Sequence, residues 1–517
     1  MNIANAKDLV IIHGLPPTAI KGDRVSIDSE FFGQDKKRLH RPHGRFAYLG
    51  CSYDGKTVYY ITDEDEVSEF YNRLRSAVHI YHHAKYDIRQ LRRYVDIPNR
   101  NLLWDTMLVE QIMYSGYYTD FSLADLVRRY CRVYMPKDVR QEFSDDTVSE
   151  ITKEQVEYAC VDVAYTWRVA KEQRAIISDD DLTIWKDIEL PFMWSLLSMS
   201  GINLDVDKWS TLALHNEKVA KEIQDEYGHW ETEGKKKKFV GINLNSPAQV
   251  KKHLLDCGAR IKSTDAEALE KIVSSGDEHD AAVIFASKLL TYRTYAKRAS
   301  TYGLKFIEDF VEPDGKIYAD MYQIGAETGR CSCRAPNLQN QPHEVEYREC
   351  FTSEGDDECI IVAEWGSQEP RIAAYLSEDQ GLMDALNSTE KLYIRVARDV
   401  LGKEIKKDSD EYKHIKSTVL GIFYGMSAKG LADRIGVDED VAQEYIDSFL
   451  ETYPGVKEYM RKQYRAKDFV TSIYGRKTWL NKYSFQWQRN ALNAPIQSSA
   501  ADAMKIAASR FNDKWIS

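Results

Sequence analysis

Apolar and polar positions alternate over short stretches in the first third of the chain. Residues 45–53 and 57–61 flank an Asp-Gly turn, which predicts a β-hairpin. Thr152 is followed three residues later by Gln155, a pair that predicts a capping box opening a helix through Trp167. Short strands mixed with capped helices indicate an α/β domain in this part of the chain.

Hydrophobic residues recur at helical spacing beyond about residue 189. Ser246 followed by Pro247 marks a clear helix start, because proline suits the first helical position. We therefore expect residues 189–303 to be helical, residues 318–374 to mix strand and loop, and the chain from Leu382 onward to be mainly helical. Five residues of the first helical stretch lie near a 3.6-residue period: Trp209, Leu212, Val219, Ile223 and Tyr227.

Composition narrows the class of protein. A chain of 517 residues suggests about three domains, at roughly 150 residues each. No apolar run approaches the roughly 18 residues of a membrane span, the first residues lack a secretion signal, and the eight cysteines include no CxxC pair. These features predict no membrane partner and a reduced, cytoplasmic environment.

The net charge is −11, which argues against a protein that binds DNA merely by coating its phosphates. An enzyme that uses carboxylates for metals and keeps basic residues in a groove remains compatible with this charge.

Carboxylates in the α/β region form a first candidate site. Asp28 and Glu30 lie two residues apart near the end of a predicted strand, so they share one face, although such a pair alone is also common in strand-end turns. Asp87 adds a third acid, and Tyr158 and Asp162 lie four apart on one helical face. Converging carboxylates can hold two Mg²⁺ ions for in-line phosphoryl displacement, and a tyrosine can orient the attacking water.

The order of these motifs resembles the 3′–5′ exonucleases of the DnaQ-like class, which have a ribonuclease H-like α/β fold. Asp105 also matches this class. His83 departs from it, because the class usually has asparagine there, and we expect the change to alter how the substrate strand is held. The resemblance implies Mg²⁺ as cofactor, with Mn²⁺ able to substitute, and it implies these catalytic residues, of which the four acids are metal ligands: Asp28, Glu30, Asp87, Tyr158 and Asp162.

A second set of motifs lies downstream. Lys416, Leu420 and Tyr424 are spaced four apart, so they share one helical face. A cation, an apolar surface and an aromatic ring in a row suit a nucleoside triphosphate beside a stacked base; an amphipathic core helix with a snorkelling lysine is the alternative interpretation. The neighbouring motifs are Thr328-Gly329-Arg330, Pro-Asn-Leu-Gln-Asn at 336–340, Glu-Trp-Gly-Ser-Gln-Glu-Pro-Arg at 364–371, and RNALNAPIQSSAADAMK at 489–505.

These segments, in this order, closely resemble the DNA polymerase I family (family A), particularly its phage branch, from Asp28 to Lys505. The resemblance implies template-directed DNA synthesis with 3′–5′ proofreading, with primer–template DNA and deoxynucleoside triphosphates as partners. It places the protein in the host bacterial cytoplasm if the gene belongs to a phage. It also implies an exonuclease domain at 1–187 and a right-hand polymerase domain at 188–517: a helical thumb at about 188–320, an α+β palm at about 321–380 and 480–517, and helical fingers at about 381–479.

The resemblance further implies roles for individual residues. Lys416 and Glu364 are implied to be catalytic, Lys416 on the incoming triphosphate and Glu364 as a palm metal ligand. Glu369 is implied to crowd the sugar 2′ position and select deoxynucleotides, supported by Arg371. The remaining substrate-binding residues are Lys413, Leu420 and Tyr424. The residues implied to bind DNA are Arg330, Asn337, Gln339, Arg489, Asn493 and Gln497, with the lysines of the thumb gripping duplex phosphates.

Several positions depart from the family pattern. Glu364 stands where the palm aspartate is usual, Tyr412 replaces an arginine beside Lys413, and Leu420 replaces an aromatic residue. The His-Asp motif that carries the second palm carboxylate is not found after the 489–505 segment, so we expect a palm incomplete at its C-terminal end. A second polypeptide or a missing segment would then complete it. The alternatives are an exonuclease on a polymerase-inactive DNA-binding body, and a non-catalytic DNA-binding or assembly subunit, against which the complete exonuclease acids weigh.

Two basic runs have no place in these motifs. The run from Lys36 to Arg45 follows the Asp28 and Glu30 pair, and we expect it to contact the phosphates of a frayed primer strand; a solvated loop is the alternative, and a metal site at His40 and His43 is disfavoured. The four lysines at 235–238 have the same two interpretations, a phosphate-contacting tip or a solvated loop.

Overall fold

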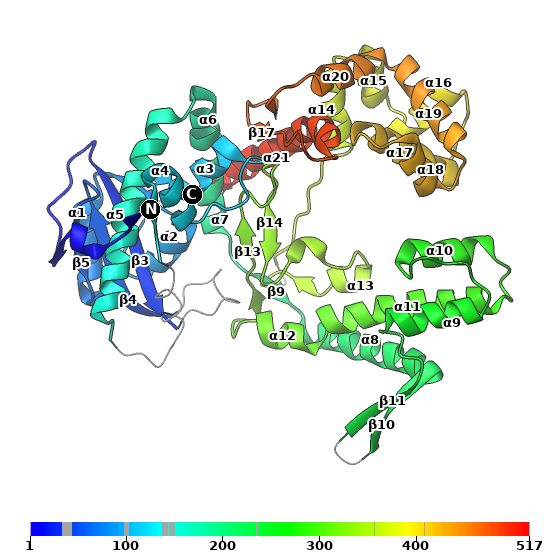
Figure 1. Ribbon diagram of the computed structural model, residues 1–517, viewed down its shortest axis with the longest axis horizontal. Coiled ribbons are helices and arrows are strands. Elements are labelled where there is room, and N and C mark those ends of the chain that lie inside the picture. The colour runs from blue at the N-terminus through cyan, green and yellow to red at the C-terminus, as the bar shows by residue number, and fades with distance from the viewer. Residues whose placement is uncertain are drawn as a thin grey trace. The chain divides into compact units, whose positions relative to one another are not determined.

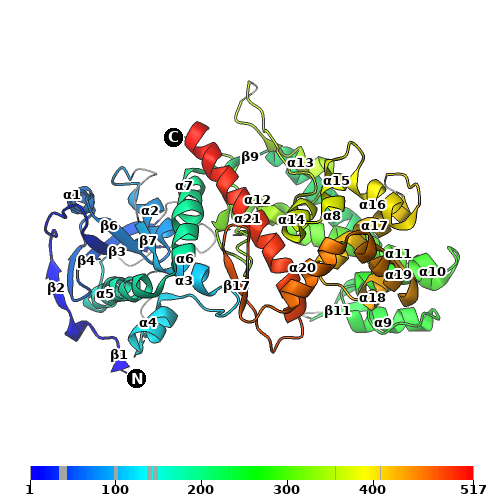
Figure 2. The same cartoon turned by 90° about the horizontal axis from the view of Figure 1, so that it is seen from above.

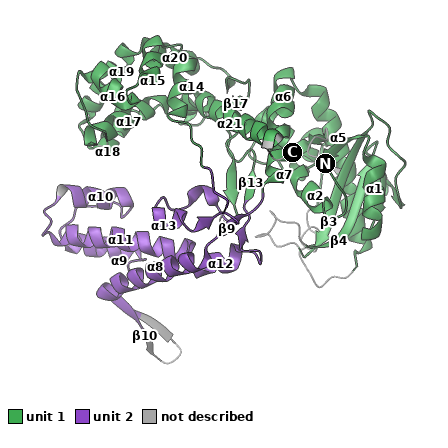
Figure 3. Cartoon of the chain, turned by 180° about the vertical axis from the view of Figure 1, so that it is seen from behind, with its two compact units in different colours: residues 1–199, 320–334, 362–517 green, residues 200–319, 335–361 purple. Residues whose placement is uncertain are grey.

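The computed structural model describes residues 2–33, 44–97, 103–136, 143, 150–233, 236–355, 357–407 and 409–515. These residues divide into two compact units (Figure 3). The first unit comprises residues 1–199, 320–334 and 362–517, and the second comprises residues 200–319 and 335–361. Among the described residues, no helix combines the length and the apolar character needed to cross a membrane.

A mixed sheet forms the centre of the N-terminal part of the first unit. Its six described strands run in the order β2-β5-β4-β3-β6-β7. The expected hairpin is present as the antiparallel pair β4–β5, and β3 joins β4 antiparallel and β6 parallel. The strands are β2 (Val10–His13), β3 (Arg24–Phe32), β4 (Arg45–Ser52), β5 (Thr57–Ile61), β6 (Val78–Tyr81) and β7 (Leu103–Asp105).

Helix α5 (Lys153–Ile176) lies across one face of this sheet, against β3 to β6 (Figure 1). Its predicted capping box is confirmed: Thr152 N–H donates to Gln155 Oε1 at 2.9 Å, and Gln155 N–H donates to Thr152 Oγ1 at 3.2 Å. The helix continues nine residues beyond Trp167 because buried Val169, Ala170 and Gln173 extend its apolar face. The other elements here are β1 (Asn2–Ile3), α1 (Val67–Leu74), α2 (Ala84–Leu91), α3 (Thr106–Tyr114), α4 (Leu123–Cys131) and β8 (Val133–Tyr134).

A second group of elements connects the sheet to the C-terminal part of the first unit. The long helix α21 (Trp487–Trp515) packs against α7 (Leu190–Ser198), as Figure 2 shows from above. The remaining elements of this group are α6 (Asp179–Ile184), the π-helical turn η4 (Trp185–Glu189), and the hairpins β13 (Asp320–Tyr322)–β14 (Ser332–Arg334) and β16 (Phe469–Thr471)–β17 (Lys477–Trp479).

Helices fill the rest of the first unit, as the sequence pattern predicts beyond Leu382. Their shared core contains Val396, Ile415, Val419 and Phe449, all buried. The helices are α14 (Gln368–Ser377), α15 (Gln380–Asn387), α16 (Leu392–Leu401), α17 (Asp410–Phe423), α18 (Ala428–Ile435), α19 (Glu439–Thr452) and α20 (Pro454–Tyr464).

The second unit is mainly helical. Helix α9 begins at Pro247 with Ser246 as its N-cap, as predicted. The expectation of helix throughout residues 189–303 is wrong at the short strand β9 (Ile202–Leu204) and at the antiparallel hairpin β10 (Gly228–Glu233)–β11 (Lys236–Gly241), whose sequence has no hydrophobic alternation to reveal it. The other elements are α8 (Val206–Tyr227), α9 (Pro247–Asp256), α10 (Ala266–Ser275), α11 (Ala281–Thr301), α12 (Leu304–Phe310), β12 (Lys316–Ile317), η5 (Leu338–Asn340), α13 (Val345–Arg348) and β15 (Phe351–Thr352).

Candidate functional site

Strand β3 carries Asp28 and Glu30 in the middle of the sheet. Both are half-buried, while the alternate residues Ile27, Ser29 and Phe31 are buried, so the two acids share one face as the spacing predicted. On the neighbouring strand β4, Gly50 pairs with Asp28. A Cβ atom at Gly50 would lie 2.0 Å from the phenol oxygen of Tyr48, so only glycine fits beside the strand at this point.

Helix α5 brings Tyr158 and Asp162 to the same region. Both side chains are half-buried and lie one helical turn apart. The helix packs against β3, and its buried Cys160 lies near Asp28: burial, with Asp28 adding a smaller contribution, raises the pKa of the Cys160 thiol to about 12. Helix α5 therefore packs against the strand that bears the first two acids, and Tyr158 packs against the small core that contains Phe32 at the end of that strand.

Asp87 ties helix α2 to the same strand. Its Oδ1 accepts hydrogen bonds from the backbone N–H of Ser29 at 3.0 Å and from Ser29 Oγ at 2.7 Å. Burial raises the pKa of Asp87 to about 7 despite these bonds. Burial first, and then the charges of Glu30, Asp87 and Asp28, raise the pKa of the adjacent Tyr86 phenol, so three of the predicted acids lie near this ring.

The predicted acids Asp28, Glu30, Asp87 and Asp162 lie in the same part of the fold, but their side chains are not arranged as a complete metal-binding site. Within the described part of the chain, no group of three or more His, Cys, Asp or Glu side chains is arranged to hold a metal ion. One reason is visible in Asp87, whose oxygen is engaged by Ser29. A second is general, because like-charged carboxylates repel one another unless a cation lies between them.

Asp105 has a structural role at this site. Its carboxylate accepts the backbone N–H groups of His83 and Ala84, at 3.2 and 2.7 Å, and also those of Met107 and Leu108, at 2.9 and 3.1 Å. It therefore caps α3 and fixes the start of α2.

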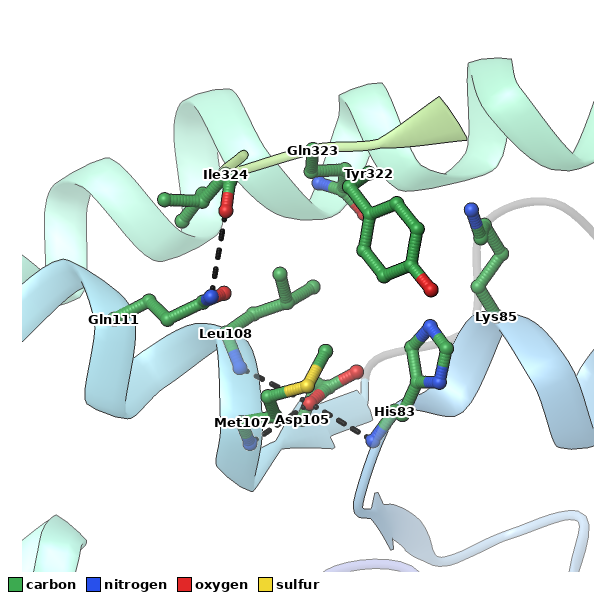
Figure 4. Close-up of a pocket in the computed structure, with 9 residues that line it drawn as sticks. All are labelled: His83, Lys85, Asp105, Met107, Leu108, Gln111, Tyr322, Gln323 and Ile324. Carbon is green, nitrogen blue, oxygen red and sulfur yellow. Dashed lines mark hydrogen bonds between the residues drawn. The ribbon is translucent and has the colours of Figure 1, made fainter. Parts of the chain in front are cut away.

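His83 precedes α2 with a left-handed backbone (φ 72°), a conformation that asparagine, aspartate and histidine adopt more readily than other side chains. The departure from asparagine is therefore compatible with the backbone. Figure 4 shows the His83 ring facing Tyr322 of the β13 strand, with ring centroids 6.1 Å apart and planes 12° from parallel. In this structure, then, the ring lies against the hairpin β13–β14.

A buried ion pair fastens the same hairpin to α2. Lys85 Nζ lies 3.1 Å from Asp320 Oδ1, and Arg334 Nε lies 3.2 Å from Asp320 Oδ2. A cavity of about 10 Å³ between α2, α3 and the hairpin is lined by His83 and Tyr322 among others (Figure 4). It has room for about one water molecule, so it is a packing feature and not a substrate site.

The downstream motifs bring three predicted side chains together. Glu369 on α14 accepts a hydrogen bond from the Tyr424 hydroxyl and forms an ion pair with Arg330. Burial and the neighbouring Glu369 carboxylate raise the pKa of Tyr424. Arg330, Glu369 and Tyr424 come from segments more than 35 residues apart in sequence, so the fold, not local chain geometry, assembles them.

Helix α17 presents its predicted residues differently. Lys416 is exposed and Leu420 half-buried, while Tyr424 is the C-cap residue that follows the helix. Lys413 pairs with Asp410 at 2.9 Å on the exposed side. Tyr412, which departs from the family arginine, packs edge-on against Tyr393 at 5.6 Å and so contributes to the helical core.

Glu364 lies in a different environment. Residues 358–365 form neither helix nor strand, and Glu364 is exposed. The guanidinium of Arg371 donates to the carbonyls of Gly366 and Leu386, at 3.2 and 3.1 Å, and to Asn387. Arg371 thus anchors the chain that follows Glu364 to the end of α15.

Helix α21 carries Arg489, Asn493 and Gln497 at four-residue spacing, with Arg489 exposed and the other two half-buried. Gln497 Oε1 lies 3.5 Å from Thr328 Oγ1, next to Arg330 in the chain. Asn337 and Gln339 belong to the second unit, where the Asn337 side chain caps η5 by accepting the Gln339 N–H at 3.1 Å.

One buried charge network was missed by the sequence analysis. Glu189 on η4 accepts from Arg476 and from Lys505, the latter at 2.5 Å, and Arg476 Nε donates to Asp502 at 2.8 Å. Burial alone would raise the pKa of Glu189, but Lys505 and Arg476 hold it below its usual value. The signal in the sequence was weak, since Asp502 and Lys505 are simply spaced three apart on a helix.

The same arginine supports a motif turn. Gly329 has φ 77°, and a Cβ there would lie 2.9 Å from Arg476 Nε. The guanidinium therefore lies directly beneath the turn that carries Arg330, and a side chain at position 329 would collide with it.

Two predictions lie outside the described residues. Residues 36–43 of the first basic run are not among them, so its contact with a primer strand stays a prediction. The backbone of Lys236–Lys238 belongs to β11, but the side chains of this lysine run, like all of Lys235, are also outside what the structure describes.

Comparisons with known proteins find relatives for both parts of the chain. Residues 214–516 match the family model of DNA polymerase family A, and residues 21–177 match a 3′–5′ exonuclease model. DNA polymerase I of Chloroflexus aurantiacus is 28% identical over 460 residues, 82% of this chain and 47% of that protein. DNA polymerase I of Pseudomonas aeruginosa is 30% identical over 462 residues, 84% of this chain and 49% of its own length.

The chain thus spans about half the length of these two relatives or less. Among solved structures, the POL domain of Pol1 from M. smegmatis, in complex with DNA primer-template and dNTP, superposes with a TM-score of 0.77 at 24% identity. That match covers 97% of this chain and 88% of the other, and it shows that the exonuclease and right-hand polymerase folds are shared.

Proposed function

Because the chain belongs to DNA polymerase family A, we propose that it performs template-directed DNA synthesis and removes misincorporated nucleotides with a 3′–5′ exonuclease. The observation that carries the proposal is the convergence of separate motifs. Asp28 and Glu30 share one face of β3, and Asp87 is bonded to Ser29 between them. In the polymerase region, Glu369 is bound by both Arg330 and Tyr424.

In the editing reaction, the ligands of Mg²⁺ would be Asp28, Glu30, Asp87 and Asp162. Their hard oxygen atoms match the donors that Mg²⁺ prefers, and their excess negative charge calls for a cation. The bound metal would lower the pKa of an attacking water and neutralise charge on the phosphate. Tyr158, one turn from Asp162, would orient that water.

In synthesis, the exposed Lys416 would neutralise the incoming triphosphate and Tyr424 would close the pocket around the new base pair. Glu369, held between Arg330 and Tyr424, would crowd the 2′ position and so favour deoxynucleotides. Leu420 and Lys413 would flank the nucleotide, and Arg371 would fix the segment beside it. Glu364 would be one metal ligand of the palm.

DNA would be contacted by residues of each unit. The residues assigned to it are Arg330, Asn337, Gln339, Arg489, Asn493 and Gln497. The corresponding domain limits are 1–187 for the exonuclease and 188–517 for the polymerase. Within the polymerase, the thumb would comprise residues of about 188–320, the palm about 321–380 and 480–517, and the fingers about 381–479.

Two-metal synthesis needs a second palm carboxylate, which we propose is supplied by a segment outside these 517 residues, attached or separate. A second candidate function, exonuclease action on a body that binds DNA without extending it, is favoured by the exposed, irregular surroundings of Glu364. A phage gene acting in a bacterial cytoplasm is a narrower proposal, which the genes flanking this one would test.

One labelled primer–template separates these possibilities. With Mg²⁺ and no nucleotides, the chain should shorten the primer, and Asp28→Ala with Glu30→Ala should reduce this by at least about 10³-fold, because metal charge stabilisation is worth several kcal/mol. The exonuclease-deficient variant with nucleotides and a His-Asp-bearing palm fragment should extend the primer. Persistent metal-dependent digestion by the double variant would refute the editing assignment. Absence of extension with the fragment would favour the second candidate.

A further inference from the structure

The segment from Arg461 to Arg489 has a charge unlike the rest of the chain. It contains eight lysines and arginines against a single acid, Asp468, in a protein whose net charge is −11. Two of the eight are withdrawn from solvent, since Arg476 lies in the buried network and the half-buried Lys477 pairs with Asp181 at 2.8 Å. The other six are exposed: Arg461, Lys462, Arg465, Lys467, Lys482 and Arg489.

The fold gathers several of these cations at one place. Residues 481–486 form a loop between β17 and α21, and Lys482 Nζ donates to the Ala466 carbonyl at 2.6 Å, at the end of α20. The same ammonium lies 3.6 Å from the ring centroid of Trp487, which packs in a small core with Ala466 and Leu480. The loop is therefore fastened beside Arg465 and Lys467 and leads directly into Arg489.

Two aromatic side chains project from this loop into solvent. Tyr483 is 101% and Phe485 92% exposed, more than any other large hydrophobic residue in the described part of the chain. A single exposed phenylalanine or tyrosine is unremarkable, but two of them, both almost fully exposed and set among cations on a fastened loop, indicate a binding surface.

We propose that the loop 481–486, with Arg465, Lys467 and Arg489, binds an unpaired stretch of a nucleic-acid strand. The cations would contact its phosphates, and the rings of Tyr483 and Phe485 would stack on its bases. This inference rests on the proposed polymerase function and extends it to the unpaired part of the template, adjoining the DNA contacts assigned to α21 through Arg489.

The chemistry favours this ligand over two others. Bases in a duplex are already stacked on one another, so two projecting rings gain little from them, whereas an unpaired strand offers free base faces. A protein partner would more often meet an apolar patch with a sparsely charged core, whereas here the rings are interspersed with cations. The pattern of alternating cations and aromatic rings is typical of single-strand binding grooves.

Binding to two labelled DNAs tests the proposal: a blunt duplex, and the same duplex with a 5′ overhang of about eight nucleotides, within the span of a single-strand site. We expect wild-type protein to prefer the overhang, and Tyr483→Ala with Phe485→Ala to weaken overhang binding about tenfold or more, because base stacking on both rings is removed. Blunt-duplex binding should not change. Tyr483→Trp with Phe485→Trp should preserve the preference, and Tyr134→Ala, which removes a 55% exposed tyrosine elsewhere, is the matched control.

The cations are tested separately. The slope of the logarithm of the overhang-binding constant against the logarithm of the salt concentration should become shallower in Arg465→Ser with Lys467→Ser. The expected change is about 0.7 for each phosphate that is no longer neutralised, and Lys7→Ser should leave the slope unchanged. Unchanged overhang binding by the double alanine variant would overturn the proposal. So would a loss confined to association of the protein with itself, which would identify the rings as a protein contact. Failure of wild-type protein to bind the blunt duplex would instead contradict the proposed function.

Discussion

The proposed editing region, residues 1–187, and the proposed synthesis region, residues 188–517, place their acids on very different supports. Asp28 and Glu30 lie on the central strand of a sheet, each between buried neighbours, and Asp87 is bonded to the strand between them. Glu364 lies in an exposed stretch without helix or strand, although the helices on either side of the synthesis region are well packed.

The difference shows that a carboxylate at the matching sequence position does not by itself make a metal site. The backbone must also hold the carboxylate oxygens at the short distances and in the nearly octahedral geometry that Mg²⁺ requires. In the editing region the sheet and two helices supply that support. In the synthesis region the support reaches α14, α17 and α21, through Glu369 and the buried Arg476 network, but it does not extend to Glu364.

The largest expected effect concerns the buried network that supports the synthesis region. Arg476→Leu leaves Glu189 and Asp502 buried with one cation, Lys505, and should lower the free energy of unfolding by about 3–5 kcal/mol. Urea unfolding followed by tryptophan fluorescence measures this loss. Arg398→Leu is the control, because its pair with Glu390 is partly exposed and should cost less than about 1 kcal/mol. Equal losses for the two variants would mean that α21 has no special support.

The editing region should be the more sensitive to acid. Burial lowers the pKa of His79 on β6 to about 4, so the unfolded chain binds its proton between pH 6.5 and 4 while the folded chain does not. Stability is therefore fully present above pH 6.5 and falls as the pH drops toward 4, by up to about 3 kcal/mol. His79→Gln should flatten this part of the stability profile measured by urea unfolding at several pH values. An unchanged slope would show that other groups dominate acid unfolding.

Adding one methylene group to an acid of the editing region, and removing one from Glu364 in the synthesis region, tests whether the two regions hold their acids differently. Asp162→Glu moves a carboxylate on α5, the helix that packs against the sheet, and primer digestion should fall by about 10–100-fold, as for other disturbances of metal geometry. Glu364→Asp should change digestion very little and should raise extension in the presence of a fragment that supplies the second palm carboxylate. A strong loss of extension in Glu364→Asp would show that the glutamate is already well placed.

Features of the fold and of the candidate site that depend on residues close together in the chain could be predicted from the sequence. The capping box of α5, the β4–β5 hairpin and the shared face of Asp28 and Glu30 depend on residues close together in the chain, and the pattern identified them. The polymerase motifs pointed to Arg330, Glu369 and Tyr424 as candidate site residues, but they did not predict that Arg330 and Tyr424 both contact Glu369.

What the sequence could not predict depends on contacts between distant segments. Nothing local indicates that Lys85 meets Asp320, or that Arg476 lies under Gly329. The bonds of Arg371 with Leu386 and Asn387 arise because α14 and α15 pack together, and a motif match cannot reveal such packing. The β10–β11 hairpin was missed because its strands lack hydrophobic alternation.

The smallest effect concerns nucleotide choice. Leu420 has neither an aromatic face nor a hydroxyl group, so it cannot compensate for a nucleotide without its 3′-hydroxyl. The enzyme completed with the palm fragment should discriminate against dideoxynucleotides, and Leu420→Tyr should reduce this discrimination by about tenfold, the worth of one hydrogen bond near 1.4 kcal/mol. Competition between the two nucleotide types on one template measures it, with Leu420→Met as the apolar control. Equal use of both by the unchanged enzyme would contradict the interpretation of Leu420.

Metal binding tests the central contrast most directly. Mn²⁺ binding to the purified chain, followed by electron paramagnetic resonance without DNA, can be compared for the wild-type protein, Asp28→Ala with Glu30→Ala, and Glu364→Ala. We expect the tightest binding to disappear in the double variant and to be unchanged in Glu364→Ala, because only the editing acids lie on a supporting framework. Loss of that binding in Glu364→Ala, with the double variant unaffected, would contradict the account.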